Sequence, residues 1–217
     1  RYIFTDISQP LCDFWQDNTS LAPCLDAGIA DIALLDVSLP FSHIDCKVSQ
    51  TKLHVADLQN PVFFIANYLW DSVPFDEFIV KDKRLFERQI QIKHIPNDTV
   101  FDFQQLDLTY RNVPCPPSRY AHSFLNELLL DYQHTSKDCS VSFPTSTLLF
   151  CEALRAQCPQ GLVLLASDKG LSEPTHFKYH DTPSFIAHDA FFSSSVNFDC
   201  IRRYTAANNG HTYFPEH

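Results

Sequence analysis

Residues 60–80 read NPVFFIANYLWDSVPFDEFIV, and this stretch decides how the rest of the chain is interpreted. It contains five consecutive apolar residues, 62–66, of branched and aromatic types, which predict a strand that is covered on both faces. The apolar run stops at Asn67, and a turn with the sequence DSVP follows. In an open parallel α/β sheet, ligands bind just beyond the carboxyl ends of such strands. Asn67, Tyr68 and Asp71 are therefore candidate site residues, although an ordinary core strand whose polar end faces solvent explains the same pattern.

The composition is that of an acidic globular protein. Of the 217 residues, 45% are apolar and 19% are charged, which argues against disorder. The net charge of -10 and the isoelectric point of about 5.3 argue against a nucleic-acid-binding face. The sequence contains no apolar run of about 18 residues or more, so it predicts no membrane span.

Two residue types are rare. The sequence contains no Met and only four Gly, and no two glycines are close enough to form a glycine-rich nucleotide loop. The lack of Met and of a glycine-rich loop leads us to expect that the sequence is a portion of a larger protein or a chain that lacks its beginning. The glycines are Gly28, Gly161, Gly170 and Gly210.

Cysteine and histidine are frequent but do not form a metal-binding pattern. None of the eight cysteines forms a C-x-x-C pair, so we expect reduced, buried thiols in preference to disulfides. The ten histidines are scattered along the sequence and form no H-E-x-x-H motif, so we expect no metal site. A G-x-S-x-G motif is also absent, which excludes the usual serine hydrolase.

Two further predicted strands end on carboxylates. Residues 1–6, RYIFTD, run into Asp6, and residues 29–37, IADIALLDV, contain Asp36 near their end. Together with the strand that ends at Asn67, they form a series of strands separated by crossover connections, which is typical of a parallel sheet. A carboxylate at such a strand end can accept hydrogen bonds from a ribose diol or an adenine amine. A helix N-cap or a turn acid is the ordinary alternative for either residue.

The middle of the chain has a different pattern. Residues 85–95 alternate apolar and polar side chains and predict an amphipathic strand, and residues 100–110 continue in a mixed pattern. We expect an insertion of antiparallel strands beside the main sheet. Residues 118–134 then predict a helix with Ser118 as its N-cap.

The last third of the chain returns to an α/β pattern. Residues 143–158 predict a helix, and residues 162–166 after Gly161 predict a second fully apolar strand that runs into Asp168. Beyond a loop, residues 193–198 are strand-like. Residues 200–208 predict a helix that stops at an Asn-Gly pair.

Several of these segments, in this order, resemble the MidA-type S-adenosylmethionine-dependent methyltransferases, a family that includes the mitochondrial complex I assembly methyltransferase. FIANYLWDSVPFDEFIV is similar to the ANE-x-x-DALPV segment of the family, and GLVLLASDKG to its next central strand with a D-Y-G-like turn. HDAFFSSSVNFDCIRRYTAANNG resembles the later segment in which V-(N/D)-F precedes a helix. RYIFTD and IADIALLDV resemble the second and third strands.

The resemblance implies an α/β fold with a Rossmann-like (class I methyltransferase), mostly parallel sheet and a strand and helix insertion after the fourth strand. Residues 1–68 and 143–217 would form the core, incomplete at its N-terminus, and residues 69–142 a substrate-side insertion. It also implies S-adenosylmethionine as the cofactor and a protein substrate, since family members methylate an arginine side chain. The implied compartment is the cytoplasm, with the mitochondrial matrix as the alternative.

The resemblance also assigns roles to individual residues. Asp6 matches the acid that holds the cofactor ribose, Asp36 the acid near the adenine, and Asn67 a residue at the junction of cofactor and substrate. Asn67 would supply an amide near the methyl group. Asp71 or Asp168 would orient or deprotonate the attacking nitrogen. The resemblance thus implies cofactor binding by Asp6, Asp36 and Asn67 and catalysis by Asn67, Asp71 and Asp168.

The sequence departs from the family at four places, one of which is the last strand of the family sheet, for which we find no match. The glycine-rich first loop of the family falls before the position that matches Arg1. The Glu that follows Asn in the ANE segment is Tyr68, and the aromatic residue of the D-Y-G-like turn is Lys169. Three hypotheses follow: an active methyltransferase, a catalytically inactive methyltransferase-like domain that acts as an assembly or interaction module, and an unrelated α/β domain.

Overall fold

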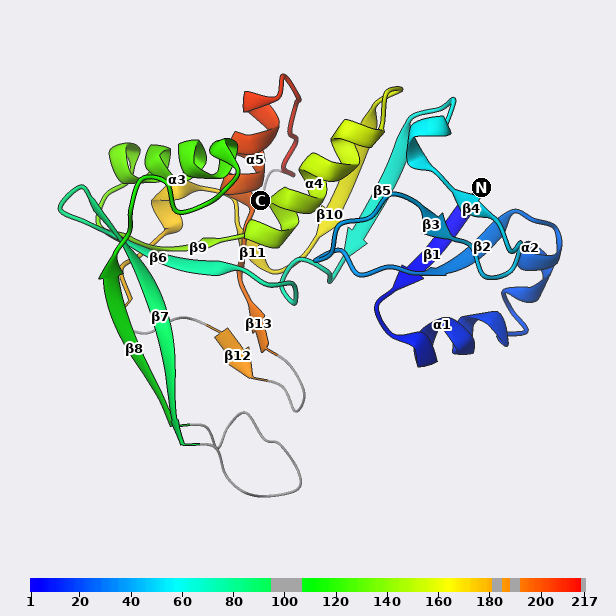
Figure 1. Cartoon of the computed structure of the whole chain (residues 1–217), viewed down its shortest axis with the longest axis horizontal. Helices are drawn as coiled ribbons and strands as arrows, with labels where there is room; N and C mark the ends of the chain where they lie inside the picture. The colour runs from blue at the N-terminus through cyan, green and yellow to red at the C-terminus, as the bar shows by residue number, and fades with distance from the viewer. Residues whose placement is uncertain (95–106, 181–184, 188–191, 216–217) are drawn as a thin grey trace. The chain divides into compact units, whose positions relative to one another are not determined.

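The protein is a mixed α/β structure, seen here in a computed structural model that describes residues 1–94, 107–180, 185–187 and 192–215 (Figure 1). It divides into two compact units. Unit 1 contains Arg1–Ile65 and Leu149–Leu165, and unit 2 contains Ala66–Leu148 and Ala166–His217. The prediction of one mostly parallel sheet is wrong for the described residues. Their strands form separate small sheets, and most of the pairings are antiparallel.

Unit 1 begins with a parallel strand pair. β1 (Tyr2–Asp6) and β2 (Ala30–Leu34) pair in register from Tyr2 opposite Ala30 to Asp6 opposite Leu34. Parallel strands need a crossover, which α1 (Gln9–Gln16) and α2 (Ala22–Asp26) supply. The helices cover one face of the pair, in a core of Cys12, Leu25, Ala30 and Ile32.

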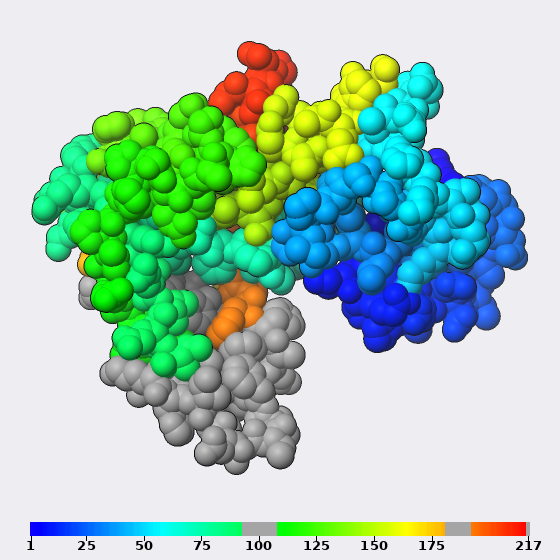
Figure 2. All heavy atoms as spheres, viewed as in Figure 1, coloured from blue at the N-terminus to red at the C-terminus, as the bar shows by residue number. Residues whose placement is uncertain are grey.

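The loop that follows β2 packs back onto this pair, and its Lys47 N–H donates to Ile32 O at 2.8 Å. It contains the short antiparallel strands β3 (Ile44–Asp45) and β4 (Lys52–Leu53) and the 3-10 turn η1 (Val55–Asp57). The Val48 N–H donates to Asp31 Oδ1 at 2.9 Å, and Asp31 is fully buried. Figure 2 shows residues 40–58 in front of β1 and β2 from this side, where little of β1 is visible.

A second parallel pair joins β5 (Val62–Asn67) to β10 (Leu162–Ser167). The Val62 N–H donates to Gly161 O at 3.0 Å and the Tyr68 N–H to Ser167 O at 2.9 Å, so both ends have the same offset and the strands run in parallel. α4 (Thr145–Gln157) lies against one face, where Phe64 and Phe150 pack with ring centroids 5.1 Å apart.

The prediction that this strand is covered on both faces is wrong, because Phe63 is 60% and Ile65 45% exposed. An unbroken apolar run shows that both faces avoid charge, but it does not show that an element packs on each of them.

Unit 2 is built on a four-stranded antiparallel sheet in the order β8-β7-β6-β9. Its alternate inward-facing residues, among them Phe78, Val80, Val141 and Phe143, are fully buried. The predicted strand over residues 85–95 is confirmed as far as His94 by the long strand β7, which pairs antiparallel with both neighbours. Its predicted amphipathic burial is wrong, because Arg88 is buried whereas Ile90 and Ile92 are 53% and 50% exposed. The part of the second predicted segment that falls on residues 100–106 lies outside the described residues. The strands are β6 (Asp76–Lys81), β7 (Arg84–His94), β8 (Asp107–Pro114) and β9 (Cys139–Phe143).

Two helices of the sequence analysis begin later than predicted. α3 (Ser123–Thr135) has His122 at its N-cap, and not Ser118. The backbone of Tyr120 exchanges hydrogen bonds of 2.9 and 2.8 Å with the Asn126 amide, which holds the preceding segment in a turn. The predicted helix start at residue 143 is also wrong, because Phe143 still pairs with β6 and precedes a proline, a position that disfavours helical backbone.

The remaining elements complete unit 2. β11 (Gly170–Leu171) pairs parallel with β14 (Val196–Asn197), and β12 (Phe185–Ala187) pairs antiparallel with β13 (Phe192–Ser194). A 3-10 turn, η3 (Pro174–His176), separates β11 from β12. Only glycine fits at Gly170, because a Cβ there would lie 2.3 Å from Val196 O. Asn197 caps α5 (Phe198–Ala207) by accepting the Cys200 N–H at 2.9 Å.

Candidate functional site

The predicted site residues of unit 2 gather where β5 and β10 end. Asn67 is the last residue of β5 and is exposed, and Asp168 follows the last residue of β10. The bond from the Tyr68 N–H to Ser167 O places these two strand ends next to each other. The structure thus brings Asn67, Asp71 and Asp168 to one edge, as expected for the carboxyl ends of parallel neighbours.

Asp168 organises the turn that follows β5. Its Oδ2 accepts the N–H groups of Trp70 at 2.9 Å and Asp71 at 3.2 Å, and its Oδ1 accepts the Lys169 N–H at 2.9 Å. Burial raises the pKa of this carboxyl, these backbone donors oppose the rise, and the charge of Asp71 adds to it. Because the carboxylate already accepts three backbone N–H groups, we infer that Asp168 positions the turn that follows β5.

A third segment reaches the same edge. The Ser194 N–H donates to Asp71 O at 2.9 Å, and the Val196 N–H donates to Lys169 O at 2.8 Å. The Asp71 carboxylate accepts the Ser72 hydroxyl at 2.7 Å on Oδ1. The candidate site is therefore the meeting point of the β5 turn, the β10 turn and the β13–β14 segment, all within unit 2.

Tyr68 adds a strained aromatic residue to this edge. Its φ of 52° lies in the left-handed region, which residues other than Gly, Asn and Asp seldom adopt. Its side chain is 73% exposed, so the ring does not pack in the core. Backbone outliers of this kind cluster at binding and active sites. Sequence reasoning placed Tyr68 at the strand end, but no pattern indicated the backbone conformation.

Asp6 and Asp36 lie at one strand edge of unit 1. The Leu35 N–H donates to Asp6 O at 2.9 Å, so the two acids follow the carboxyl ends of neighbouring parallel strands. Asp6 Oδ1 accepts the Ser8 N–H at 2.7 Å, and Asp36 Oδ1 accepts the Ser38 N–H at 2.8 Å. Each acid therefore stabilises a turn, which is the ordinary alternative to a cofactor-binding role, and each uses only its Oδ1 for this contact. Whether either binds a cofactor stays a prediction.

Sequence reasoning missed a buried ion pair in the four-stranded sheet. Glu77 and Arg88 approach to 3.8 Å from β6 and β7, and their side chains are 12% and 0% exposed. Burial raises the pKa of Glu77 to about 7, and the positive charge of Arg88 opposes the rise. The cross-strand spacing could have indicated the pair only once the β6–β7 register was known.

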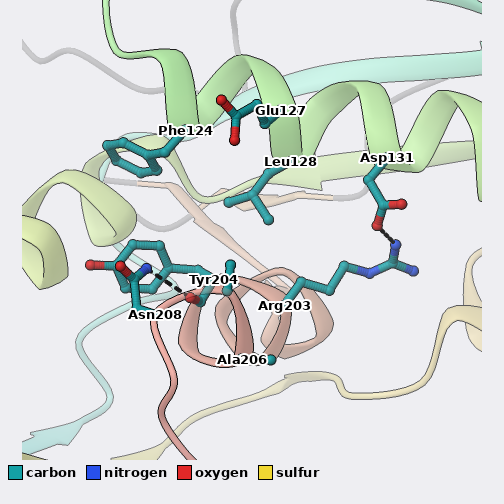
Figure 3. A pocket seen from close by; sticks show the side chains of 9 residues that line it. Phe124, Glu127, Leu128, Asp131, Arg203, Tyr204, Ala206 and Asn208 are labelled. Atoms are coloured by element: carbon teal, nitrogen blue, oxygen red, sulfur yellow. Dashed lines mark hydrogen bonds and ion pairs between the residues drawn. The ribbon is translucent and has the colours of Figure 1, made fainter.

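A separate hollow of about 370 Å³ lies between α3 and α5 (Figure 3). Apolar side chains of Phe124, Leu128 and Tyr204 line it together with the ion pair of Arg203 and Asp131. None of the predicted site residues lines this hollow. Arg203 also pairs with the buried Asp199, which accepts the Tyr132 hydroxyl at 2.8 Å.

Two classes of feature are absent from the part of the chain that the structure describes. It holds no group of three or more His, Cys, Asp and Glu side chains that could bind a metal ion. None of its helices has the length and apolar character needed to cross a membrane. All eight cysteines are free thiols, and six of them are buried; the prediction of burial is wrong for Cys24, which is exposed, and for Cys115, which is partly buried.

Comparisons with known proteins give a fold relationship. The sequence matches no protein-family model and no curated protein. The structure matches that of "a COG1565 superfamily member and likely methyl transferase from Burkholderia thailandensis bound to S-adenosyl-homocysteine", and COG1565 is the MidA family. The TM-score is 0.54 at 13% sequence identity, over 95% of this chain and 48% of the other. The chain thus spans about half the length of that protein, and over this length it has a methyltransferase-like fold.

Proposed function

We propose that this chain forms part of an S-adenosylmethionine-dependent methyltransferase. One observation carries the proposal: 95% of the chain matches the fold of a protein bound to S-adenosyl-homocysteine. In addition, polar side chains of this chain lie at the carboxyl ends of its parallel strands. Ligands of α/β folds bind at such strand ends. When bound, the cofactor supplies an electrophilic methyl group.

The two acids of unit 1 suit the nucleoside part of this cofactor. Asp6 and Asp36 each accept their turn hydrogen bond on Oδ1. A carboxylate has about four lone-pair sites, so each can still accept a hydroxyl or amine donor on the other oxygen. Ribose hydroxyls and the adenine amine are donors of this kind. We assign Asp6 to the ribose and Asp36 to the adenine, in line with the family resemblance.

The three site residues of unit 2 suit the methyl acceptor. Methyl transfer needs in-line placement of the nucleophile and removal of its proton. Asn67 is exposed at the strand end and offers an amide for orientation. Asp71 is the candidate base, while Asp168 holds the backbone of Asp71 in place through the 3.2 Å bond to its N–H.

We further propose a protein side chain as the methyl acceptor, with arginine as the first candidate. The resemblance to the MidA-type family supports arginine, and a net charge of -10 favours association with a basic protein. The same resemblance favours the cytoplasm, with the mitochondrial matrix as the alternative.

The second candidate function is an inactive methyltransferase-like module for assembly or protein interaction. One observation favours it: Tyr68 occupies the place of the family Glu, so the edge lacks the carboxylate that the family has at this position. The module would keep the fold and lose the cofactor affinity.

Calorimetric titration of S-adenosyl-homocysteine into the product of the complete coding sequence separates the two. We expect one-to-one binding, weakened about 5-fold to 150-fold by Asp6→Ala, because an unpaired polar group costs about 1–3 kcal/mol. Asp26→Ala removes an exposed acid at the end of α2, before β2 begins, and should leave the affinity unchanged. No binding by the folded wild-type protein would favour the inactive module.

A further inference from the structure

The Tyr68 side chain lies open at the candidate site. Tyr68 follows the last residue of β5, and its side chain is 73% exposed. Within the residues that the structure describes, its hydroxyl makes no hydrogen bond and its ring lies against no other ring. The hydroxyl of Tyr132, in contrast, donates to Asp199 at 2.8 Å. The ring of Tyr68 is therefore available to a ligand.

The backbone holds this ring at the edge of the site in a conformation that tyrosine disfavours. The φ of Tyr68 is 52°, a value at which Cβ crowds the backbone. Two hydrogen bonds on either side fix this conformation: the Tyr68 N–H donates to Ser167 O, and the Trp70 N–H donates to Asp168 Oδ2, both at 2.9 Å. Glycine would adopt the same φ without this strain. Because the exposed ring adds no packing that offsets the strain, we look for its role in binding.

The charges near Tyr68 leave the ring as the feature that can select a cation. The Asp168 carboxylate already accepts three backbone N–H groups. Lys169 is exposed beside it, and its positive charge offsets one of the two acids. Asp71 accepts the Ser72 hydroxyl on Oδ1 at 2.7 Å, so its Oδ2 can accept from a ligand. The edge thus offers one carboxylate oxygen and one open aromatic face.

An aromatic face attracts a cation because the ring carries negative charge density above and below its plane. The same chain holds two guanidinium groups in this way. Arg203 lies 4.5 Å from the centroid of the Tyr132 ring. Arg119 lies 5.3 Å from the centroid of the Tyr120 ring. A guanidinium is planar and more weakly hydrated than an ammonium group, so it stacks well on such a face.

We propose that Tyr68 is a specificity-determining residue whose ring receives the guanidinium group of an arginine side chain in the methyl acceptor. The ring covers one face of the guanidinium, and Asp71 Oδ2 accepts an N–H from its edge. This inference rests on the proposed methyltransferase function, and it names the contact that selects the acceptor. A neutral side chain of the same shape lacks the charge that the ring attracts.

Peptide binding to the product of the complete coding sequence tests this role. The probes are two fluorescein-labelled pentapeptides of glycine that carry either arginine or its neutral isostere citrulline at the centre. Fluorescence polarisation measures their affinities with and without S-adenosyl-homocysteine, so a failure of cofactor binding is distinguishable from a loss of cation preference. We expect the wild-type protein to bind the arginine peptide about 2-fold to 5-fold more tightly, the size of an exposed cation–π contact.

Variants at position 68 assign the preference to the ring. Tyr68→Phe keeps the aromatic face and should keep the preference, whereas Tyr68→Leu should abolish it. Pentafluorophenylalanine at position 68 keeps the ring but reverses the charge on its faces, so it should also abolish the preference. The control Tyr179→Leu removes a tyrosine that is 40% exposed beside Lys81, the last residue of β6, and should change nothing. The proposal is overturned if the wild-type protein shows no preference, or if the preference survives Tyr68→Leu or the fluorinated ring.

Discussion

Removal of the Asp168 carboxylate gives the most direct test of how the candidate site is built. This side chain accepts the N–H groups of Trp70, Asp71 and Lys169 at 2.9, 3.2 and 2.9 Å. Asp168→Ala leaves all three donors without this partner. We therefore expect the turn after β5 to loosen, and the free energy of unfolding to fall.

The expected loss in the free energy of unfolding can be calculated from the three hydrogen bonds. A hydrogen bond to a charged group contributes about 1.5–3 kcal/mol, and bonds that share one carboxylate are not additive. Asp168 is also partly exposed, so water can replace some of the lost bonds. We expect Asp168→Ala to cost about 2–4 kcal/mol. Asp168→Asn should cost about half as much, because its amide oxygen can still accept from one side of the turn.

Urea unfolding measures both variants, and Trp70, which is 3% exposed, is a fluorescent reporter inside the affected turn. Asp36→Ala is the matched control, because Asp36 also closes a turn after a parallel strand but accepts only from Ser38. We expect about 0.5–1 kcal/mol for that control. A loss below about 0.5 kcal/mol for Asp168→Ala would refute the reasoning that this carboxylate holds the turn.

Three further predictions concern unit 2. Tyr68→Gly should raise the free energy of unfolding by up to about 1 kcal/mol, because φ is 52° and the ring is 73% exposed; a loss in urea unfolding would show that the ring makes a stabilising contact. Because the folded pKa of Glu77 is raised from 4.5 to about 7, the wild-type protein should lose stability as the pH rises through that window. Glu77→Gln should flatten this slope in urea midpoints taken from pH 4 to pH 8, whereas an unchanged slope would exclude Glu77 as its source. Tyr132→Phe should cost about 1–3 kcal/mol, because the fully buried hydroxyl donates to Asp199 at 2.8 Å; a thermal melt equal to that of the wild type would contradict this contact.

Local sequence patterns predicted where most described elements lie. The apolar runs that start at Val62 and Leu162 are strands, and the alternation after Leu85 is the long strand β7. The starts of two helices were misplaced, because a turn anchored by Asn126 and a proline after Phe143 act through contacts that no single-residue preference contains. Strand order was not predictable either, since hydrogen bonding between distant strands depends on the whole chain.

The sequence likewise predicted one part of the candidate site and not another. The sequence indicated that polar residues follow the strands, and the structure places Asn67, Asp71 and Asp168 at one edge of unit 2. It could not indicate that Asp168 accepts three backbone donors, because those donors belong to a turn 97 and 98 residues away and to its own neighbour. The assignment of catalytic and cofactor roles stays a prediction for all five acids and amides, and the titration described above tests the cofactor role of Asp6.

Phe63 and Phe64 show why an apolar pattern alone does not reveal what surrounds a strand. Both are phenylalanine in one strand, yet one is 60% exposed and the other packs against Phe150. Hydrophobicity fixes the tendency of a side chain to leave water, while the covering element is set by the rest of the polypeptide. The discrepancy at Phe63 is therefore informative: the sequence pattern is that of a strand covered on both faces, and the described residues cover only the face of Phe64.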